Sequence, residues 1–166
     1  MDILYHAVSG IAIAKSMDAS SPYGAAVFAM LPDLAGIIPY FSIKFIEAAK
    51  NPDGGVIKTF MHLVQNNRFV TRIDTTAYRA THSLFTAAAI AVLTYAFFRD
   101  QWVLLSVSYL SHILIDIPTH DEDFATRIFF PVSDFHMQGA NWTTHPKLFL
   151  FFWAVLGIIV FFLWRT

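Results

Sequence analysis

Five long apolar runs, separated by short polar stretches, make up most of the chain. They cover residues 3–14, 23–42, 84–98, 101–117 and 148–164, and none of them contains Lys, Arg or Glu. A helix that crosses a bilayer needs about 20 apolar residues, so each run is slightly short by itself. Strand signals are weak along the whole chain. Together the runs predict an all-α integral membrane protein, a bundle of four to five helices in one domain over residues 1–166.

Residues at the ends of the runs predict where the helices begin and where they bend. Ser21 suits the N-cap of the second helix, and Pro22 suits its first position. Thr81 is the expected N-cap of the third helix. Pro32 and Pro39 lie inside the second run, where a proline removes a backbone hydrogen bond. A break or kink is therefore expected there.

The composition strengthens the membrane prediction. Charged residues make up 14% of the chain and hydrophobic residues 56%, whereas soluble domains carry about 25% charged residues. The alternative is a soluble all-α protein whose runs form a buried core. A net charge of −1 gives no nucleic-acid signature. The absence of cysteine excludes disulfides and thiolate metal sites.

Basic residues concentrate between the second and third runs, in a predicted loop over residues 43–80. They are Lys44, Lys50, Lys58, Arg68, Arg72 and Arg79. The positive-inside rule places this loop in the cytoplasm. The connection over residues 119–146 then lies on the same side, and Trp102 and Trp164 lie on the opposite side, as in an aromatic belt.

The fourth run ends in the stretch SHILIDIPTH, residues 111–120, which carries three titratable side chains. His112 and Asp116 are one helical turn apart and share a face. A tight turn at residues 99–100 makes the third and fourth helices an antiparallel hairpin, which brings His82 level with Asp116. These three side chains are expected to converge near the cytoplasmic end, whereas His120 follows a proline and is less firmly tied to them.

Two further residues in the apolar runs are expected to join this group. His6 reaches the cytoplasmic face if the first helix crosses outward, and Asp33 comes level with it if the second helix breaks at Pro32. Three histidines and two aspartates suit Zn²⁺, and also Mn²⁺ or Fe²⁺. Five ligands exceed what one catalytic zinc needs, so one or two ions are expected. Such ions activate water and clamp phosphoryl oxygens.

Each candidate ligand also has a simpler explanation. His112 and Asp116 can form a hydrogen-bonded pair, and His6 can bond across a helix interface. Asp33 can cap a helical turn, and His82 can lie in an exposed first turn. Ionisable residues inside a membrane are rare and usually functional, which favours the joint interpretation.

The order of these motifs resembles the membrane-bound metal-dependent hydrolases of the YdjM/YbcI type in bacteria and archaea. The shared pattern is an early histidine at His6, a Pro-Asp ending at Asp33, a Thr-His-Ser-Leu around His82, and a His-x-x-x-Asp from His112 to Asp116. The ligand order is also similar to that of zinc-dependent phospholipases C. The resemblance implies a phosphoesterase in the prokaryotic cytoplasmic membrane, acting on a phospholipid or related headgroup from the cytoplasmic side.

The chain departs from the family pattern at several positions. Ala35 stands where family members often carry a second acid, and Tyr78-Arg79-Ala80 stands where they often have His-Arg-Gly. The last His-x-x-x-Glu of the phospholipases has no counterpart. These departures argue against a trinuclear site and favour one or two metals.

The resemblance and the chemistry suggest roles for several side chains. Asp116, or else Asp33, would bridge the ions. Arg79 would neutralise phosphate charge, and Ser83 or Thr81 would hydrogen-bond a phosphate oxygen. The rival hypothesis is a non-enzymatic membrane protein that binds or transports metal ions or protons through the same cluster. Few polar groups continue toward Trp102 and Trp164, which disfavours transport.

The connection between the last two runs carries a second notable stretch, TRIFFPVSDFHMQGANW at residues 126–142. Its aromatic residues suit either a lid over the metal site or an interfacial segment anchored in the headgroup layer. Membrane lipid is accordingly the expected partner. Whether this region adds ligands stays open for His120, Asp134, His136 and His145.

Overall fold

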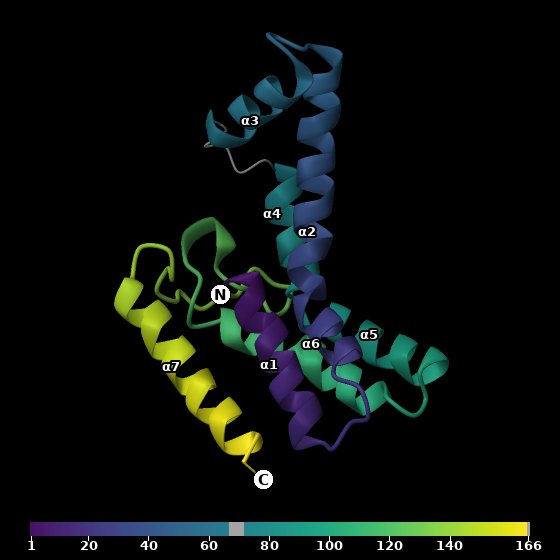
Figure 1. The fold of residues 1–166 in the computed structure, drawn as a ribbon. Coiled ribbons are helices and arrows are strands. Elements are labelled where there is room, and N and C mark those ends of the chain that lie inside the picture. Colours follow the sequence, from purple (N-terminus) through teal and green to yellow (C-terminus); the bar gives the residue numbers. More distant parts are fainter. Residues whose placement is uncertain (67–71, 166) are drawn as a thin grey trace.

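The computed structural model describes residues 1–66 and 72–165. In these ranges the chain forms seven α-helices and one short 3-10 helix, without a strand (Figure 1). The elements are α1 (Ile3–Ser16), α2 (Tyr23–Lys50), α3 (Val56–Asn66), α4 (Arg72–Thr81), α5 (Leu84–Phe97), α6 (Trp102–Asp116), η1 (Glu122–Phe124) and α7 (Pro146–Leu163). The prediction of an all-α protein is confirmed.

The second helix is longer and more continuous than predicted. It begins at Tyr23, after Pro22, and no side chain caps it. It then runs for 28 residues through Pro32 and Pro39. Of the break or kink expected there, the break is wrong. Membrane helices tolerate internal prolines because neighbouring groups satisfy the freed carbonyls.

The predicted loop over residues 43–80 is also wrong. Its first residues continue α2, and α3 and α4 occupy most of the remainder. These two helices each have one apolar and one polar face, so a search for apolar runs passes over them. Lys58 lies on α3, and Arg72 and Arg79 lie on α4. Lys44 and Lys50 belong to α2, and Arg68 lies outside the described residues. Phe60 of α3 packs against Phe41 and Phe45 of α2, with ring centroids 6.0 Å apart in both pairs.

The start of α5 shows how the third apolar run is separated from α4. Ser83 is extended and caps α5, since its Oγ accepts a hydrogen bond from the Thr86 amide at 3.2 Å. The expected cap, Thr81, instead ends α4 and donates to the Ala77 carbonyl at 3.0 Å. The chain therefore breaks at His82 and Ser83, between two helices bent by 56°.

Close packing of small residues brings α1 against α2. A Cβ atom added to Gly10 would lie 2.6 Å from the Ala25 carbonyl oxygen and 2.9 Å from the Ala29 Cβ. Ala25 and Ala29 are fully buried. Small residues allow helix backbones to approach closely in membrane proteins. α6 packs against both helices and completes what we call the centre, formed by α1, the first half of α2 and α6.

The outer surface is strongly apolar. In the described residues, two helices, α2 and α7, are long and apolar enough to cross a membrane, and the bent pair of α4 and α5 can form a third span. This is fewer than the five runs suggested, because α1 and α6 are short. Figure 1 shows the second half of α2 standing apart from the centre together with α3 and α4; we call this region the arm.

Candidate metal centre

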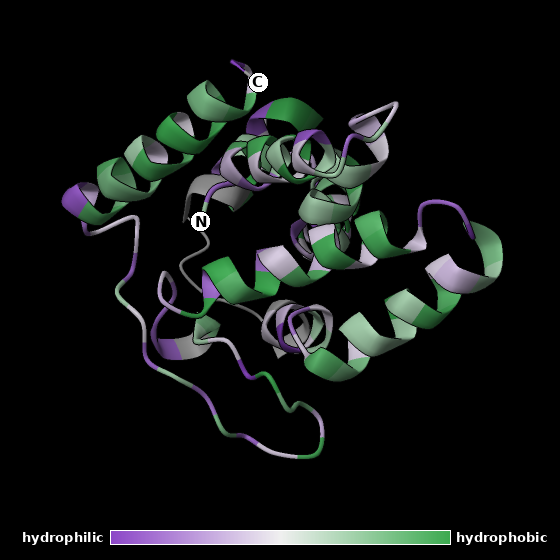
Figure 2. Ribbon diagram, turned by 90° about the horizontal axis from the view of Figure 1, so that it is seen from below, coloured by the Kyte–Doolittle hydropathy of each residue, from purple (hydrophilic) through white to green (hydrophobic). Residues whose placement is uncertain are grey.

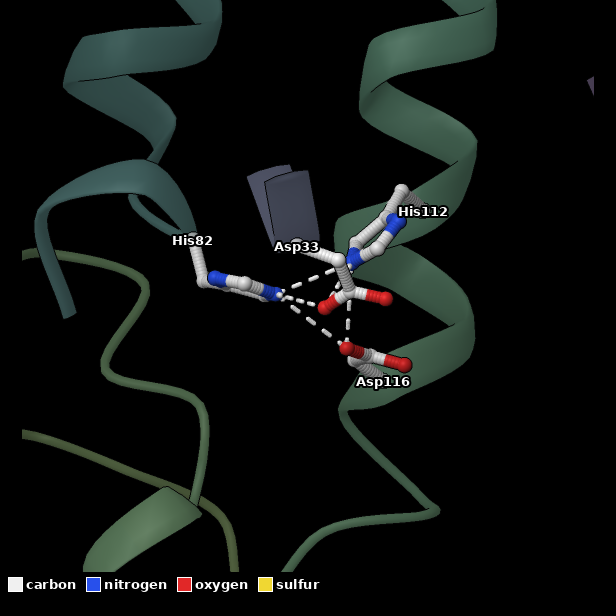
Figure 3. Close-up of side chains that lie close together, drawn as sticks. All are labelled: Asp33, His82, His112 and Asp116. Carbon is white, nitrogen blue, oxygen red and sulfur yellow. Dashed lines mark hydrogen bonds and ion pairs between the residues drawn. The ribbon is translucent and has the colours of Figure 1, made fainter. Parts of the chain in front are cut away.

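Four titratable side chains from three parts of the chain meet where α2, α6 and the break before α5 come together (Figure 3). Asp33, His82, His112 and Asp116 each offer one ligand atom, and these atoms all lie within 4.8 Å of one another. The Nε2 atoms of His82 and His112 are 2.9 Å apart, and each lies 3.2 Å from Asp116 Oδ2. The convergence of His82, His112 and Asp116 expected from the hairpin is therefore found.

The two other predicted ligands also reach this group. Asp33 Oδ1 lies 3.5 Å from His112 Nε2 and 3.8 Å from His82 Nε2. His6 Nε2 lies 3.1 Å from Asp116 Oδ1, and the His6 ring stacks on His112 with centroids 3.6 Å apart. Asp33 comes level because α2 packs across α6, with no break in the helix.

Backbone carbonyls orient the two histidines that face each other. His82 Nδ1 donates to the Tyr78 carbonyl at 2.9 Å, and His112 Nδ1 donates to the Ala29 carbonyl at 2.6 Å. A carbonyl oxygen can only accept, so Nδ1 carries the proton and Nε2 of a neutral ring has a free lone pair. This is the arrangement that orients histidine ligands in metal sites.

The result is a buried group of acceptors. His82, His112 and Asp116 have no exposed surface, and Asp116 Oδ2 accepts no hydrogen bond although two Nε2 atoms lie nearby. Burying a carboxylate without a compensating charge is costly. The buried Met1 ammonium balances one of the two carboxylates. Two nitrogens with two carboxylates form a donor set that suits a divalent cation, which would balance the other carboxylate.

The second oxygen of Asp116 faces a different set of groups. Oδ1 accepts a hydrogen bond from the Met1 amino group at 2.6 Å and lies 3.1 Å from His6 Nε2. His120 Nδ1 lies 3.5 Å from the same oxygen. Burial lowers the pKa of the His120 imidazole to about 4, so this ring is uncharged at neutral pH. The turn after Pro118 thus keeps His120 beside the cluster, which the sequence left uncertain.

The other residues predicted to act in catalysis, Arg79 and Ser83, lie outside the cluster of four candidate metal ligands. Ser83 caps α5 and donates to the Ala80 carbonyl at 3.1 Å, so its hydroxyl has a structural role. The Thr81 hydroxyl is likewise bonded to backbone carbonyls of α4. Arg79 precedes the break, and its Nε is buried without a hydrogen-bond partner. A role for Arg79 in binding phosphate stays a prediction.

The remaining candidates lie in the connection between α6 and α7. Asp134 is exposed and pairs with Arg127 at 2.8 Å, and His136 Nδ1 donates to the Asp134 carbonyl. His145 Nδ1 donates to the Asn141 carbonyl just before α7. These contacts are local to the connection and account for the three side chains without a metal.

Sequence reasoning missed Tyr78 as part of the site. Its ring stacks on His82 with centroids 3.8 Å apart, and its carbonyl orients the same histidine. Tyr78 lies four residues before His82, so the i,i+4 rule applied to an assigned α4 would have revealed it. The role of the Ala29 carbonyl could not be predicted in this way, because every residue has a backbone carbonyl and the identity of an alanine does not show which ones bind a side chain.

Comparison with known proteins identifies the family. The chain matches the model of the YdjM inner membrane protein family over residues 1–166. The protein belongs to the YdjM inner membrane protein family. Neither the curated proteins nor the solved structures contain a match. The family and the apolar helices together confirm the membrane location of this YdjM chain, and confirm that part of the resemblance seen in its motifs.

Proposed function

We propose that this protein is a metal-dependent membrane hydrolase whose cation is held by Asp33, His82, His112 and Asp116. The observation that carries the proposal is the set of facing acceptors, two Nε2 atoms with free lone pairs and two carboxylate oxygens within 4.8 Å. A divalent cation in such a site supplies a water of lowered pKa and a positive charge for a phosphoryl oxygen.

The donor set supports a particular range of metals. Nitrogen and carboxylate donors suit Zn²⁺, and also Mn²⁺ or Fe²⁺. Asp116 turns its second oxygen toward His6 and away from His82, so the same carboxylate can serve one ion or bridge two. Bonding of Nδ1 to a backbone carbonyl in both rings leaves Nε2 as the nitrogen of each neutral ring that can bind a cation.

The proposed reaction is hydrolysis of a phosphoester, with a phospholipid or related headgroup as substrate. The membrane location supports a lipid substrate, and the similarity of the ligand order to zinc-dependent phospholipases C supports the phosphoester bond. Lys44, Lys50 and Lys58 lie on the arm, which adjoins the cluster through α4. The positive-inside rule then favours a site that faces the cytoplasm.

Transport of metal or protons is less well supported. Thr94 and Ser106 lie between α5 and α6 with their hydroxyls 2.9 Å apart, but each hydroxyl also bonds to a carbonyl of its own helix. Ser108 does the same on α6. These hydroxyls are occupied locally, which disfavours a polar path from the cluster to the other end of the helices.

The decisive test compares metal content and hydrolysis in purified protein. The wild-type protein should contain about one or two divalent ions per chain and should hydrolyse a phospholipid or a phosphomonoester. The His112→Ala, Asp116→Ala double variant should lose at least tenfold in both. His62→Ala is the control, because His62 is an exposed histidine of α3. Metal content that stays unchanged in the double variant would refute the site. Bound metal without hydrolysis, together with ion uptake into proteoliposomes, would instead favour transport.

A further inference from the structure

The connection between α6 and α7 reaches out from the helices as a long loop (Figure 2). Four large apolar side chains near its far end are exposed, and we call them the apolar tip. They are Phe129 (41% exposed), Val132 (77%), Phe135 (53%) and Met137 (52%). Exposed apolar clusters of this kind mark contact with a partner or a membrane.

The two limbs below the apolar tip are firmly attached to the protein. On one limb the amides of Gly139, Ala140 and Trp142 donate to the carbonyls of residues 118–120 at 2.9 to 3.2 Å. On the other limb the Ile128 carbonyl accepts from the Leu84 amide at 2.9 Å. The attachment includes the turn that carries His120, so the apolar tip is held at a defined distance from the candidate metal centre.

Charge on the tip is compensated. Residues 129–137 contain one Asp and no Lys, Arg or Glu. That residue, Asp134, is paired with Arg127 at 2.8 Å. Asp134 lies between Val132 and Phe135 in the sequence. An isolated carboxylate there would oppose entry into an apolar layer, whereas a carboxylate paired with Arg127 opposes it less.

The position of the loop in the chain indicates that the apolar tip lies at the membrane surface. The loop leads directly into α7, one of the helices long and apolar enough to cross the membrane. The segment that precedes a membrane-crossing helix lies at the membrane–water boundary, where aromatic side chains are enriched. Apolar side chains exposed at this level face the layer between the headgroups and the acyl chains.

We infer that the apolar tip inserts into the phospholipid bilayer and holds the loop against the membrane beside the cluster of Asp33, His82, His112 and Asp116. This inference rests on the membrane location and on the loop's contacts, and it does not require hydrolysis. It also chooses the interfacial anchor over the lid among the two roles that the sequence left open.

The absence of cysteine allows a direct test by single labelling. Val132→Cys is labelled with an environment-sensitive fluorophore and reconstituted into phosphatidylcholine–phosphatidylglycerol vesicles. A quencher attached to the lipid acyl chains should reduce the fluorescence at least threefold more than aqueous iodide does. Asp53→Cys, in the exposed turn between α2 and α3, is the matched control and should show the opposite preference. Unchanged helicity and gel-filtration behaviour establish that both variants fold.

Two outcomes would overturn the inference. Preferential quenching by iodide at residue 132 would place the tip in water. Protection from both quenchers, with energy transfer between labels on separate chains, would show that a second copy covers the tip. Neither outcome affects the metal-content test, so this inference and the proposed function fail independently.

Discussion

The centre buries polar side chains, and the arm exposes apolar ones. In the centre, His6, His112 and Asp116 are fully buried among α1, α2 and α6. In the arm, Ile38, Phe45 and Ile46 of α2 are more than half exposed. A soluble protein would show the reverse order. This contrast with a soluble protein indicates that the exposed surface is adapted to lipid as its solvent. The buried polar group persists because its members compensate one another.

The largest effect should come from removing the carboxylate at the middle of the centre. Asp116→Ala leaves the Met1 amino group and three histidines without their common partner. Breaking a buried charge pair costs about 3–5 kcal/mol, so we expect a large loss of stability together with loss of bound metal. Thermal unfolding in detergent and elemental analysis measure the two effects.

A truncation to alanine in the arm should affect stability far less than Asp116→Ala does. Ile46→Ala removes an exposed side chain and should change stability in detergent by about 0.5 kcal/mol or less. Equal destabilisation by the two substitutions would show that the arm is as tightly packed as the centre, and would contradict the comparison.

Two helical glycines test the packing difference more closely. Gly10→Ala places a Cβ 2.6 Å from the Ala25 carbonyl oxygen, so it should destabilise the protein by about 1–3 kcal/mol through overpacking. Gly36 is the last residue of the first half of α2 and faces open space, since nothing lies within 4 Å of a carbon added there. Gly36→Ala should stabilise the helix by up to about 1 kcal/mol. Unfolding of both variants in the same detergent gives the comparison directly.

A modest effect is expected at the end of the arm, where α4 meets α5. Ser83→Ala removes the cap of α5 and should cost about 1 kcal/mol. Metal content should be unchanged, and Ser83→Asp, which keeps a capping oxygen, should restore stability. A loss of hydrolysis exceeding the loss of stability would instead support the catalytic role first suggested for this hydroxyl.

Sequence reasoning succeeded where a short-range rule applied. The separation of His112 and Asp116 puts them on one helical face, and the turn at residues 99–100 brings His82 level with Asp116. Reasoning failed where helices were amphipathic. The basic residues between 43 and 80 suggested a loop. Without α4, Thr81 is the cap that the sequence predicts for the third helix, whereas Ser83 caps that helix.

The helical class, the membrane setting and the identity of the five side chains that meet at the centre could be predicted from the sequence. Helix periodicity and apolar composition are local properties, so they can be recognised without knowledge of the fold. How those side chains face one another depends on the tertiary structure. The two oxygens of Asp116 serve different neighbours, and the Ala29 carbonyl directs His112. Such contacts join residues distant in the chain, and they depend on the packing of α6 against α1 and α2.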